Sequence, residues 1–399
     1  MLFNGKLLDE VNEEDIHALV TFGYSEIKTR EFKQILPGNS DNEKKEFLAD
    51  VSSFANASGG FIVYGVKEEN GIATSIQGLQ ISDQDSEKLR IESIIQNGVQ
   101  PRIPGLIIQT ILMQDRSYIF IIQIPKSWCS PHMVTYQNNS KFFSRNSSGK
   151  YQFDITEIKQ AFLGSEGISD QIRNFRLDRI SKIVAKETPI QLNHGAKIAL
   201  HIIPIQSYLQ NIEIPIVNLV KDHLKIETLA TRSGNFRINL DGLVTFFTIR
   251  DGSNKSYTQV FRNGIIEILD EFILNRDNNE LNIPITYLEK NIIESCTSLL
   301  SLLHSYNIES PYIIFLTLIE VKGYNFAFSQ QMQSRLFMGI EESNFKIDRE
   351  MIMFPEVILE IVSEISIQQG LRPLFDSIWN ACGYQKSLNY DNTGKWNPI

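Results

Sequence analysis

The chain has 399 residues, of which 42% are hydrophobic and 21% charged, and its formal net charge is −9. This length predicts two domains. The acidic net charge argues against non-specific binding of nucleic acid by the whole surface, but it is compatible with a local basic groove. The three cysteines are widely separated, the N-terminus carries acids too early for a signal peptide, and no apolar run is long enough to span a bilayer. We therefore expect a cytoplasmic protein without a membrane segment.

The first informative stretch follows a predicted helix at residues 12–20, whose acids lie in the first turn. It reads SEIKTREFKQ over residues 25–34. In a strand, period-two alternation would place Glu31 and Lys33 on one face and Phe32 on the other. Glu26 and Glu31, five residues apart, can reach one site only if a bend or bulge lies between them.

A second helix is predicted after residue 40. Ser40 and Glu43 form a capping box, and an apolar stripe predicts one buried face; the stripe is Phe47, Leu48, Val51, Phe54 and Ala55. Asn56 ends the helix, and Gly59-Gly60 permits a tight turn. A buried strand follows at 61–66, and Asn70-Gly71 indicates a hairpin turn. Glu68 and Glu69 lie where this strand ends, either as carboxylates of a site or as solvated turn residues.

The region from Arg116 to Phe153 contains no Asp or Glu. A helix predicted at 83–96 and a strand predicted at 106–113 precede it, and a strand predicted at 118–124 lies within it. Its cations and His132 are interleaved with aromatic side chains, which is typical of a phosphate-contacting surface. The alternative is that the aromatic residues belong to the core and the cations are scattered. No Walker A loop occurs in the chain.

The remainder has an α/β texture. We expect a short helix at 154–162, a linker at Gly164-Ser165-Glu166-Gly167, and a bridging helix at 169–186. Strands are predicted at 196–203, 224–229, 242–249 and 312–321, and helices at 287–304 and 355–364. His194 and His201 are interpreted as core or surface residues, since no companion ligands stand at metal-site spacing. The predicted organisation is an N-terminal domain at 1–163, a linker and bridging helix at 164–187, and a C-terminal α/β domain at 188–399.

Several spaced motifs carry a family resemblance. Glu26-x4-Glu31-Phe32-Lys33 is followed by Phe54-Ala55-Asn56-x2-Gly59-Gly60, then by Gly65-Val66, and finally by Ile76-x-Gly78. In this order the motifs resemble the Schlafen AlbA-type domain, and the blocks IPKSWCSPH and FFSRNSSGK are similar to recurrent blocks of its bacterial members. The resemblance implies an α/β (α+β mixed) fold for the N-terminal domain, with a mixed sheet and flanking helices.

The resemblance also implies a site. In the Schlafen branch, two glutamates and an aspartate after the GV strand form a metal-dependent nuclease site that acts on structured RNA. Glu26 and Glu31 match the first two, and Glu68 or Glu69 stands in place of the third. The expected catalytic residues are Glu26, Glu31, Glu68 and Lys33, with Glu69 as the alternative third carboxylate, and Mg²⁺ or Mn²⁺ would be held by Glu26, Glu31 and Glu68. The expected nucleic-acid contacts are Lys28, Arg30, Lys126, His132, Lys141, Arg145 and Lys150.

The function implied is that of a metal-dependent endoribonuclease on tRNA or other structured RNA, in anti-phage defence. A second hypothesis is a non-catalytic DNA- or RNA-binding module or transcriptional regulator that uses the same fold. A third is an assembly module whose N-terminal domain forms a homodimer. The expected partner is therefore a nucleic acid rather than a membrane, with homodimerisation left open.

Overall fold

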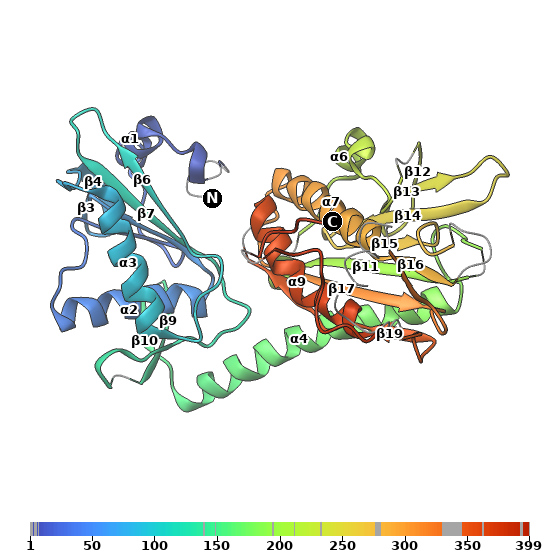
Figure 1. Cartoon of the computed structure of the whole chain (residues 1–399). Coiled ribbons are helices and arrows are strands. Elements are labelled where there is room, and N and C mark those ends of the chain that lie inside the picture. The colour runs from blue at the N-terminus through green and yellow to red at the C-terminus, as the bar shows by residue number, and fades with distance from the viewer. Residues whose placement is uncertain are drawn as a thin grey trace. The chain divides into compact units, whose positions relative to one another are not determined.

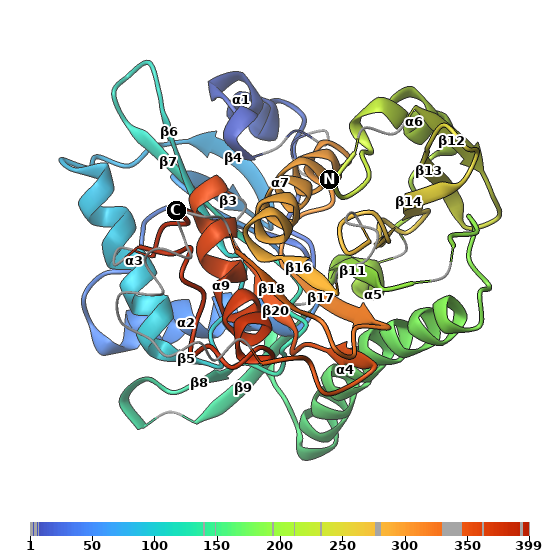
Figure 2. The same ribbon diagram turned by 45° about the vertical axis from the view of Figure 1, so that its right-hand side comes forward.

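The computed structural model of the protein divides into two compact units, Met1–Asp170 and Gln171–Ile399, both of mixed α/β structure, as predicted (Figure 1, Figure 2). It describes residues 3, 6, 8–138, 140–147, 149–193, 195–210, 212–231, 234–275, 281–328, 345–360, 363–391 and 394–398. His194 lies outside these residues. No helix in the described part of the chain is both long and apolar enough to cross a membrane.

The N-terminal unit is built around a four-stranded mixed sheet in the order β1-β2-β7-β6, in which only β1 and β2 are parallel. A second sheet has the order β10-β9-β8-β5, and β3 and β4 form a separate hairpin. The elements are η1 Leu8–Glu10, α1 Glu13–Thr21, β1 Arg30–Lys33, α2 Asp41–Asn56, β2 Gly60–Tyr64, β3 Val66–Glu69, β4 Ile72–Ile76, α3 Gln84–Gly98, β5 Val99–Gln100, β6 Ile107–Leu112, β7 Tyr118–Ile124, β8 Met133–Val134, η2 Tyr136–Asn138, β9 Lys141–Asn146 and β10 Gly149–Gln152.

Alternating side chains give the first sheet two apolar faces. Ile119 and Ile121 of β7 pack with α1 residues such as Ile16, whereas Phe120 and Ile122 pack with α2 and α3. Strand alternation explains this division, because successive side chains point to opposite faces. Helix α2 therefore lies on one face of β1, which places its buried side against the charged residues of that strand.

The C-terminal unit contains an antiparallel sheet in the order β12-β13-β14-β15-β11-β17-β19, with β20 also paired to β17. Apolar residues of α7 and α9 cover one face, and Ile180 and Ile183 of α4 pack on the other. Its elements are α4 Ile155–Val184 (shared with the first unit), β11 Lys197–Pro204, α5 Gln206–Leu209, α6 Ile216–Lys221, η3 His223–Lys225, β12 Asn235–Ile238, β13 Gly242–Thr248, β14 Asn254–Phe261, β15 Ile266–Asp270, β16 Asn282–Pro284, α7 Ile285–Ser305, β17 Tyr312–Ile319, β18 Asn325–Ala327, β19 Met351–Met353, β20 Val357–Leu359 and α9 Glu364–Asn380.

A buried polar cluster joins α4 to this sheet. The Arg179 guanidinium donates two hydrogen bonds to the Glu267 carboxylate, at 2.7 and 2.8 Å. Tyr257 donates to the same carboxylate, and the His201 Nε2 atom lies 3.0 Å from it. Burial alone would raise the pKa of Glu267, but Arg179 and His201 hold it at about 2. His201 thus lies in the core, as interpreted from the sequence.

Three expectations about secondary structure are wrong. Gly164–Gly167 is not a linker but part of the continuous helix α4. Both flanking segments are helical, and each glycine costs a helix only about 1 kcal/mol. Residues 224–229 form no strand, since a 3-10 turn covers only His223–Lys225. Residues 355–364 hold strand β20, because Val357–Leu359 pairs with β17, and the helix begins later, at Glu364. Short apolar runs do not distinguish strand from helix by periodicity alone.

Gly60 allows the backbone to turn from α2 into β2. Its φ is +149°, and a Cβ atom at this position would lie 2.3 Å from the backbone oxygen of Thr29. We predict that Gly60→Val lowers the free energy of unfolding by about 3 kcal/mol or more, through backbone strain and overlap. Gly164→Ala is the control, since a Cβ there meets nothing within 4 Å. Thermal unfolding of both variants measures the difference; a Gly60→Val protein as stable as Gly164→Ala contradicts the prediction.

Asn56 connects three segments through its side-chain amide. Its Nδ2 atom donates to the carbonyl oxygens of His132 and Phe143, both at 2.9 Å, and its Oδ1 atom accepts from the His132 N–H. Asp cannot donate these two bonds and would face two carbonyl oxygens with its charge. We predict that Asn56→Asp lowers the free energy of unfolding by about 2–4 kcal/mol.

Chemical denaturation checks this value against Asn97→Asp, an exposed change whose amide bonds only to Ser93 of its own helix. The control is expected to stay within about 1 kcal/mol of the wild type. Equal losses in the two variants would show that the Asn56 cross-link does not stabilise the fold.

Candidate functional site

The segment before β1 bends so that Glu26 returns toward Glu31. Ile27 and Arg30 exchange backbone hydrogen bonds across a tight turn, which is the bend that the sequence requires. The Glu26 Oε1 atom accepts a hydrogen bond from the Phe32 N–H at 2.9 Å. Phe32 itself points into the apolar core on the α1 side, whereas Glu31 and Lys33 pair with each other on the opposite face. The predicted alternation along this strand is confirmed.

Glu68 is brought to Glu26 by the β3–β4 hairpin. The Gly71 N–H donates to Glu68 Oε2, and the Gly71 carbonyl accepts from the Glu26 N–H, each at 2.6 Å. Burial raises the pKa of Glu26, and the nearby charges of Glu31 and Glu68 raise it further, against the hydrogen bond from Phe32 and the charge of Lys33. Glu69 instead forms an exposed ion pair with Lys67 at 2.9 Å. The geometry thus separates the two candidates, and Glu68 is the one that lies beside Glu26.

Glu31 is buried and bound by two cations. Its Oε1 atom lies 2.5 Å from the Lys33 ammonium, and its Oε2 atom accepts from Arg145 Nη2 at 2.8 Å. Burial would raise the pKa of this carboxyl, but Lys33 and Arg145 outweigh it and leave the pKa lowered. The Arg145 guanidinium also stacks on the Phe54 ring, 3.6 Å from its centroid. Glu31 is therefore an ionised carboxylate held in place from two sides.

Asp50 of α2 belongs to the same cluster, although the sequence analysis did not single it out. It is only 4% exposed; its Oδ1 atom lies 2.7 Å from Lys150 Nζ, and its Oδ2 atom lies 3.7 Å from Lys33 Nζ. Burial and the charge of Glu31 raise its pKa, which the two lysines oppose. A signal was present, since an acid stands between Phe47 and Phe54 on the apolar stripe of a predicted helix.

Strands β9 and β10 each contribute one of the cations, Arg145 and Lys150. Arg145 and Lys150 are directly paired in this antiparallel ladder, so their side chains lie on the same face. Lys150 also donates to the backbone and carboxylate oxygens of Glu46. The predicted phosphate contacts of Arg145 and Lys150 thus come to the site, but both side chains are paired with acids there.

The remaining predicted contacts are dispersed. Lys28, Lys126 and Lys141 are exposed, and Arg30 stacks near the Tyr24 ring while donating to the Ser25 carbonyl. His132 and Arg145 are both buried, and their contact with nucleic acid stays a prediction. The His132 Nδ1 atom lies 2.7 Å from the Pro101 carbonyl oxygen, and burial lowers its pKa to about 4. His132 is consequently neutral at physiological pH.

The carboxylates have the right chemistry for Mg²⁺ or Mn²⁺, since both ions prefer oxygen ligands. Their arrangement does not form such a site: within the described residues, no group of three or more His, Cys, Asp or Glu side chains could hold a metal ion. The reason is visible at Glu31, where each carboxylate oxygen already has a cationic partner. A metal could use Glu31 only after one of these partners leaves.

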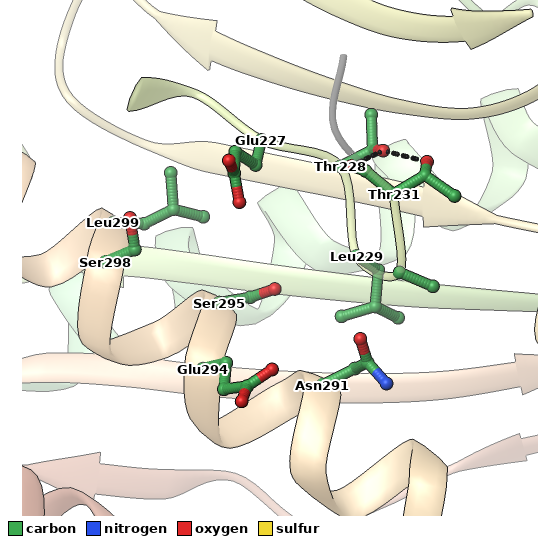
Figure 3. Close-up of a pocket in the computed structure, with 10 residues that line it drawn as sticks. Glu227, Thr228, Leu229, Thr231, Asn291, Glu294, Ser295, Ser298 and Leu299 are labelled. Carbon is green, nitrogen blue, oxygen red and sulfur yellow. Dashed lines mark hydrogen bonds between the residues drawn. The ribbon is translucent and has the colours of Figure 1, made fainter. Parts of the chain in front are cut away.

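A separate cavity of about 170 Å³ lies in the C-terminal unit, between residues 227–231 and helix α7. Figure 3 shows Asn291, Glu294 and Ser295 along the helix, with Thr228 and Thr231 hydrogen-bonded to each other across the loop. The described lining residues include two glutamates and several hydroxyl groups but no Lys, Arg or His. This lining, with two acids and no cation, does not suit a phosphate group.

A family model matches the part of the chain that holds the carboxylate cluster. Residues 26–154 match the family model described as "Schlafen, AlbA_2". No curated protein matches the chain. A solved structure, that of the DIP2311 protein from Corynebacterium diphtheriae, is 13% identical, with 35% of this chain and 26% of that chain covered and a TM-score of 0.24. A likeness this low carries no argument about fold or function.

The matched residues contain all the charged groups of the cluster, from Glu26 to Lys150. The family resemblance predicted from the spaced motifs is therefore confirmed over this part of the chain. Residues 26–154 resemble the Schlafen AlbA-type domain family, which suggests a nucleic-acid-binding or nuclease-type function for this region.

Proposed function

We propose that the N-terminal unit is a metal-dependent endoribonuclease that acts on tRNA or similarly structured RNA. The observation that carries the proposal is the gathering of Glu26, Glu31 and Glu68 from three separate segments around one turn and one strand. Acids brought this close repel one another, as the raised pKa of Glu26 indicates. Such crowding is costly unless it serves a site, and carboxylates with perturbed pKa values occur often in catalytic centres.

In the proposed mechanism, the chain's own residues bind and orient the RNA phosphate. Lys33 is half-buried and kept charged, because Asp50 and Glu31 raise its pKa against the effect of burial. It can therefore place a fixed positive charge beside the scissile phosphate. Glu26 and Glu68 would be the carboxylates to hold a divalent cation, whose charge would offset that of the phosphate, although the described residues do not gather a third ligand for it.

The finer parts of the proposal depend on the resemblance of residues 26–154. These parts are the choice of tRNA, the preference for Mg²⁺ or Mn²⁺, and a role in anti-phage defence. A cytoplasmic location and homodimerisation stay predictions from the sequence.

A second candidate function is a non-catalytic RNA- or DNA-binding module, including a transcriptional regulator. The observation that favours it is that both carboxylate oxygens of Glu31 already have a cationic partner, Lys33 or Arg145. Under this alternative, Glu31 is a structural anchor, and binding is carried by exposed lysines such as Lys126 and Lys141. The nuclease would need Glu26 and Glu68 for RNA cleavage, whereas the binding module would not need them to bind nucleic acid.

We predict that Glu26→Gln and Glu68→Gln each reduce tRNA cleavage in Mn²⁺ by about a thousandfold, because each removes a charged oxygen ligand. Binding of tRNA should be unchanged or tighter, since one negative charge near the phosphate is lost. Cleavage by the wild type should also stop on addition of EDTA. The measurements are initial cleavage rates and a binding isotherm for each variant.

Glu69→Gln is the matched control, because Glu69 is the neighbouring residue and its carboxylate pairs with Lys67 at the surface. It should cleave at the wild-type rate. Glu31→Gln is less informative alone, since it leaves the buried Arg145 without its counter-charge and should destabilise the fold by about 3–5 kcal/mol. Wild-type rates in both Glu26→Gln and Glu68→Gln would reject the nuclease and favour the binding module.

Nucleic-acid affinity should depend on the exposed part of the acid-free region. We predict that Lys126→Glu with Lys141→Glu weakens RNA binding and flattens its salt dependence by about 0.9 in log–log slope for each phosphate that the variant no longer neutralises. Titrations at several salt concentrations measure both quantities. Lys221→Glu with Lys346→Glu, two exposed lysines of the C-terminal unit, changes the net charge equally and is the control. The same weakening in the control would show a general charge effect instead of a binding surface.

A further inference from the structure

The cavity between residues 227–231 and helix α7 has the size of a small organic ligand. Its volume is about 170 Å³. Since an apolar cavity of about 150 Å³ takes up benzene, this one suits a ligand of about six to eight non-hydrogen atoms. Each wall contributes one carboxylate, Glu227 from the loop and Glu294 from the helix, and the described lining holds no Lys, Arg or His (Figure 3). The charge of the lining therefore favours a cation.

The two threonines of the loop have no hydroxyl hydrogen left for a ligand. Thr228 Oγ1 donates to the Thr231 carbonyl oxygen at 2.7 Å, so the hydrogen bond between the two hydroxyl groups, also 2.7 Å, uses the hydrogen of Thr231. A hydroxyl group has one hydrogen and two lone pairs. What these side chains can still offer is lone pairs, so this wall of the cavity is complementary to a ligand that donates hydrogen bonds.

Asn291 gives the helix wall the same character. It is only 8% exposed, and its Nδ2 atom donates to the Tyr287 carbonyl oxygen of the same helix at 2.7 Å. This bond sets the orientation of the amide, and its oxygen points toward the loop (Figure 3). No described residue donates a hydrogen bond to that oxygen. Because a buried amide oxygen without a donor is unfavourable, a donor group in the cavity would complete the site.

The walls are fixed and partly apolar. Thr258 of β14 donates to the Glu227 carbonyl oxygen at 2.8 Å, which ties the loop to the sheet. Leu229 and Leu299 line the cavity and belong to the core of the C-terminal unit. A ligand that fits this cavity therefore combines a charged donor group with a short hydrocarbon part.

One cation lies near the cavity without lining it. Lys290 Nζ is 3.8 Å from Glu294 Oε1, and the two side chains are 54% and 63% exposed. Exposed ion pairs of this kind contribute little free energy, and both long side chains can separate. Lys290 therefore leaves the Glu294 carboxylate able to bind a cation inside the cavity.

We propose that this cavity binds a primary alkylammonium group, which donates to the oxygens of Asn291 and of the glutamates while its carbon chain contacts Leu229 and Leu299. An ammonium group has three N–H donors and no acceptor, which matches a lining of acceptors. Its hydrogen bonds to carboxylates are charge-assisted and therefore strong. The group could belong to a free amine or to the lysine side chain of another protein. This site is separate from the carboxylate cluster of the N-terminal unit.

The test is isothermal titration calorimetry of the full chain with three probes. Butane-1,4-diamine has six non-hydrogen atoms, and we expect it to bind saturably with a Kd below about 1 mM. Butane-1,4-diol has the same length but no charge, and it should bind at least about tenfold more weakly. Nα-acetyl-lysine methylamide carries the ammonium group as a protein side chain does. Tighter binding of this probe than of the diamine assigns the group to a protein partner, and the reverse assigns it to a free amine; both results support the site.

Variants of the two carboxylates test the lining. Glu227→Gln and Glu294→Gln should each weaken diamine binding about tenfold and leave diol binding within about twofold, because Gln keeps an acceptor oxygen but loses the charge. Glu350→Gln is the matched control. Its carboxylate is exposed and lies 4.0 Å from Lys322, much as Glu294 lies near Lys290, but it does not line the cavity. Diamine binding to the control should stay within about twofold of the wild type.

Asn291→Leu tests the amide oxygen separately. It removes an acceptor without changing the charge, so it should weaken the diamine and the diol alike, by about three- to tenfold. Thermal unfolding confirms that each variant is folded at the assay temperature. The inference is overturned if neither amine binds saturably, or if the diol binds as tightly as the diamine. Equal losses of diamine affinity in Glu294→Gln and Glu350→Gln would also overturn it, since they would show an effect of net charge alone.

Discussion

The buried ion pair between Glu31 and Arg145 is the contact on which the N-terminal unit depends. It joins β1 to β9, and through the Phe54 ring it reaches α2, so that three elements from distant parts of the chain share one pair of charges. Charges are buried only where a partner of opposite sign is present, because the loss of solvation is otherwise too large. The positions of Lys33, Asp50 and Lys150 follow from the need to balance this cluster.

This arrangement gives Glu31 two tasks that a single substitution cannot separate. The same carboxylate anchors a buried arginine and stands among the acids proposed to serve catalysis. A loss of activity on its replacement would be expected from either task. Glu26 and Glu68 are different, because their hydrogen bonds come from the backbone N–H groups of Phe32 in β1 and of Gly71 in the β3–β4 turn, which carry no charge that must be neutralised.

The sequence predicted the parts of the site that depend on local signals. The capping box at Ser40 and Glu43, the Asn70-Gly71 turn, and the alternation of Glu31, Phe32 and Lys33 are each fixed by a few neighbouring residues, and all were confirmed. The choice between Glu68 and Glu69 could not be made, because it depends on which carboxylate the hairpin turns toward Glu26. The burial of Arg145 could not be predicted, because it depends on α2, almost a hundred residues earlier in the chain. Asp50 was missed, although an acid on a buried helical stripe is unusual, because the prediction for this helix used only its apolar pattern.

Helix α4 has a consequence for how the chain can be divided. Arg179 lies on this helix, and it supplies two of the hydrogen bonds that keep the Glu267 carboxylate ionised inside the C-terminal core. A fragment that begins at residue 188, where the sequence suggested the second domain starts, would retain the buried acid without its arginine. One that begins at residue 171 would retain both. The compact C-terminal unit therefore includes a piece of the helix that the sequence assigned to a connector.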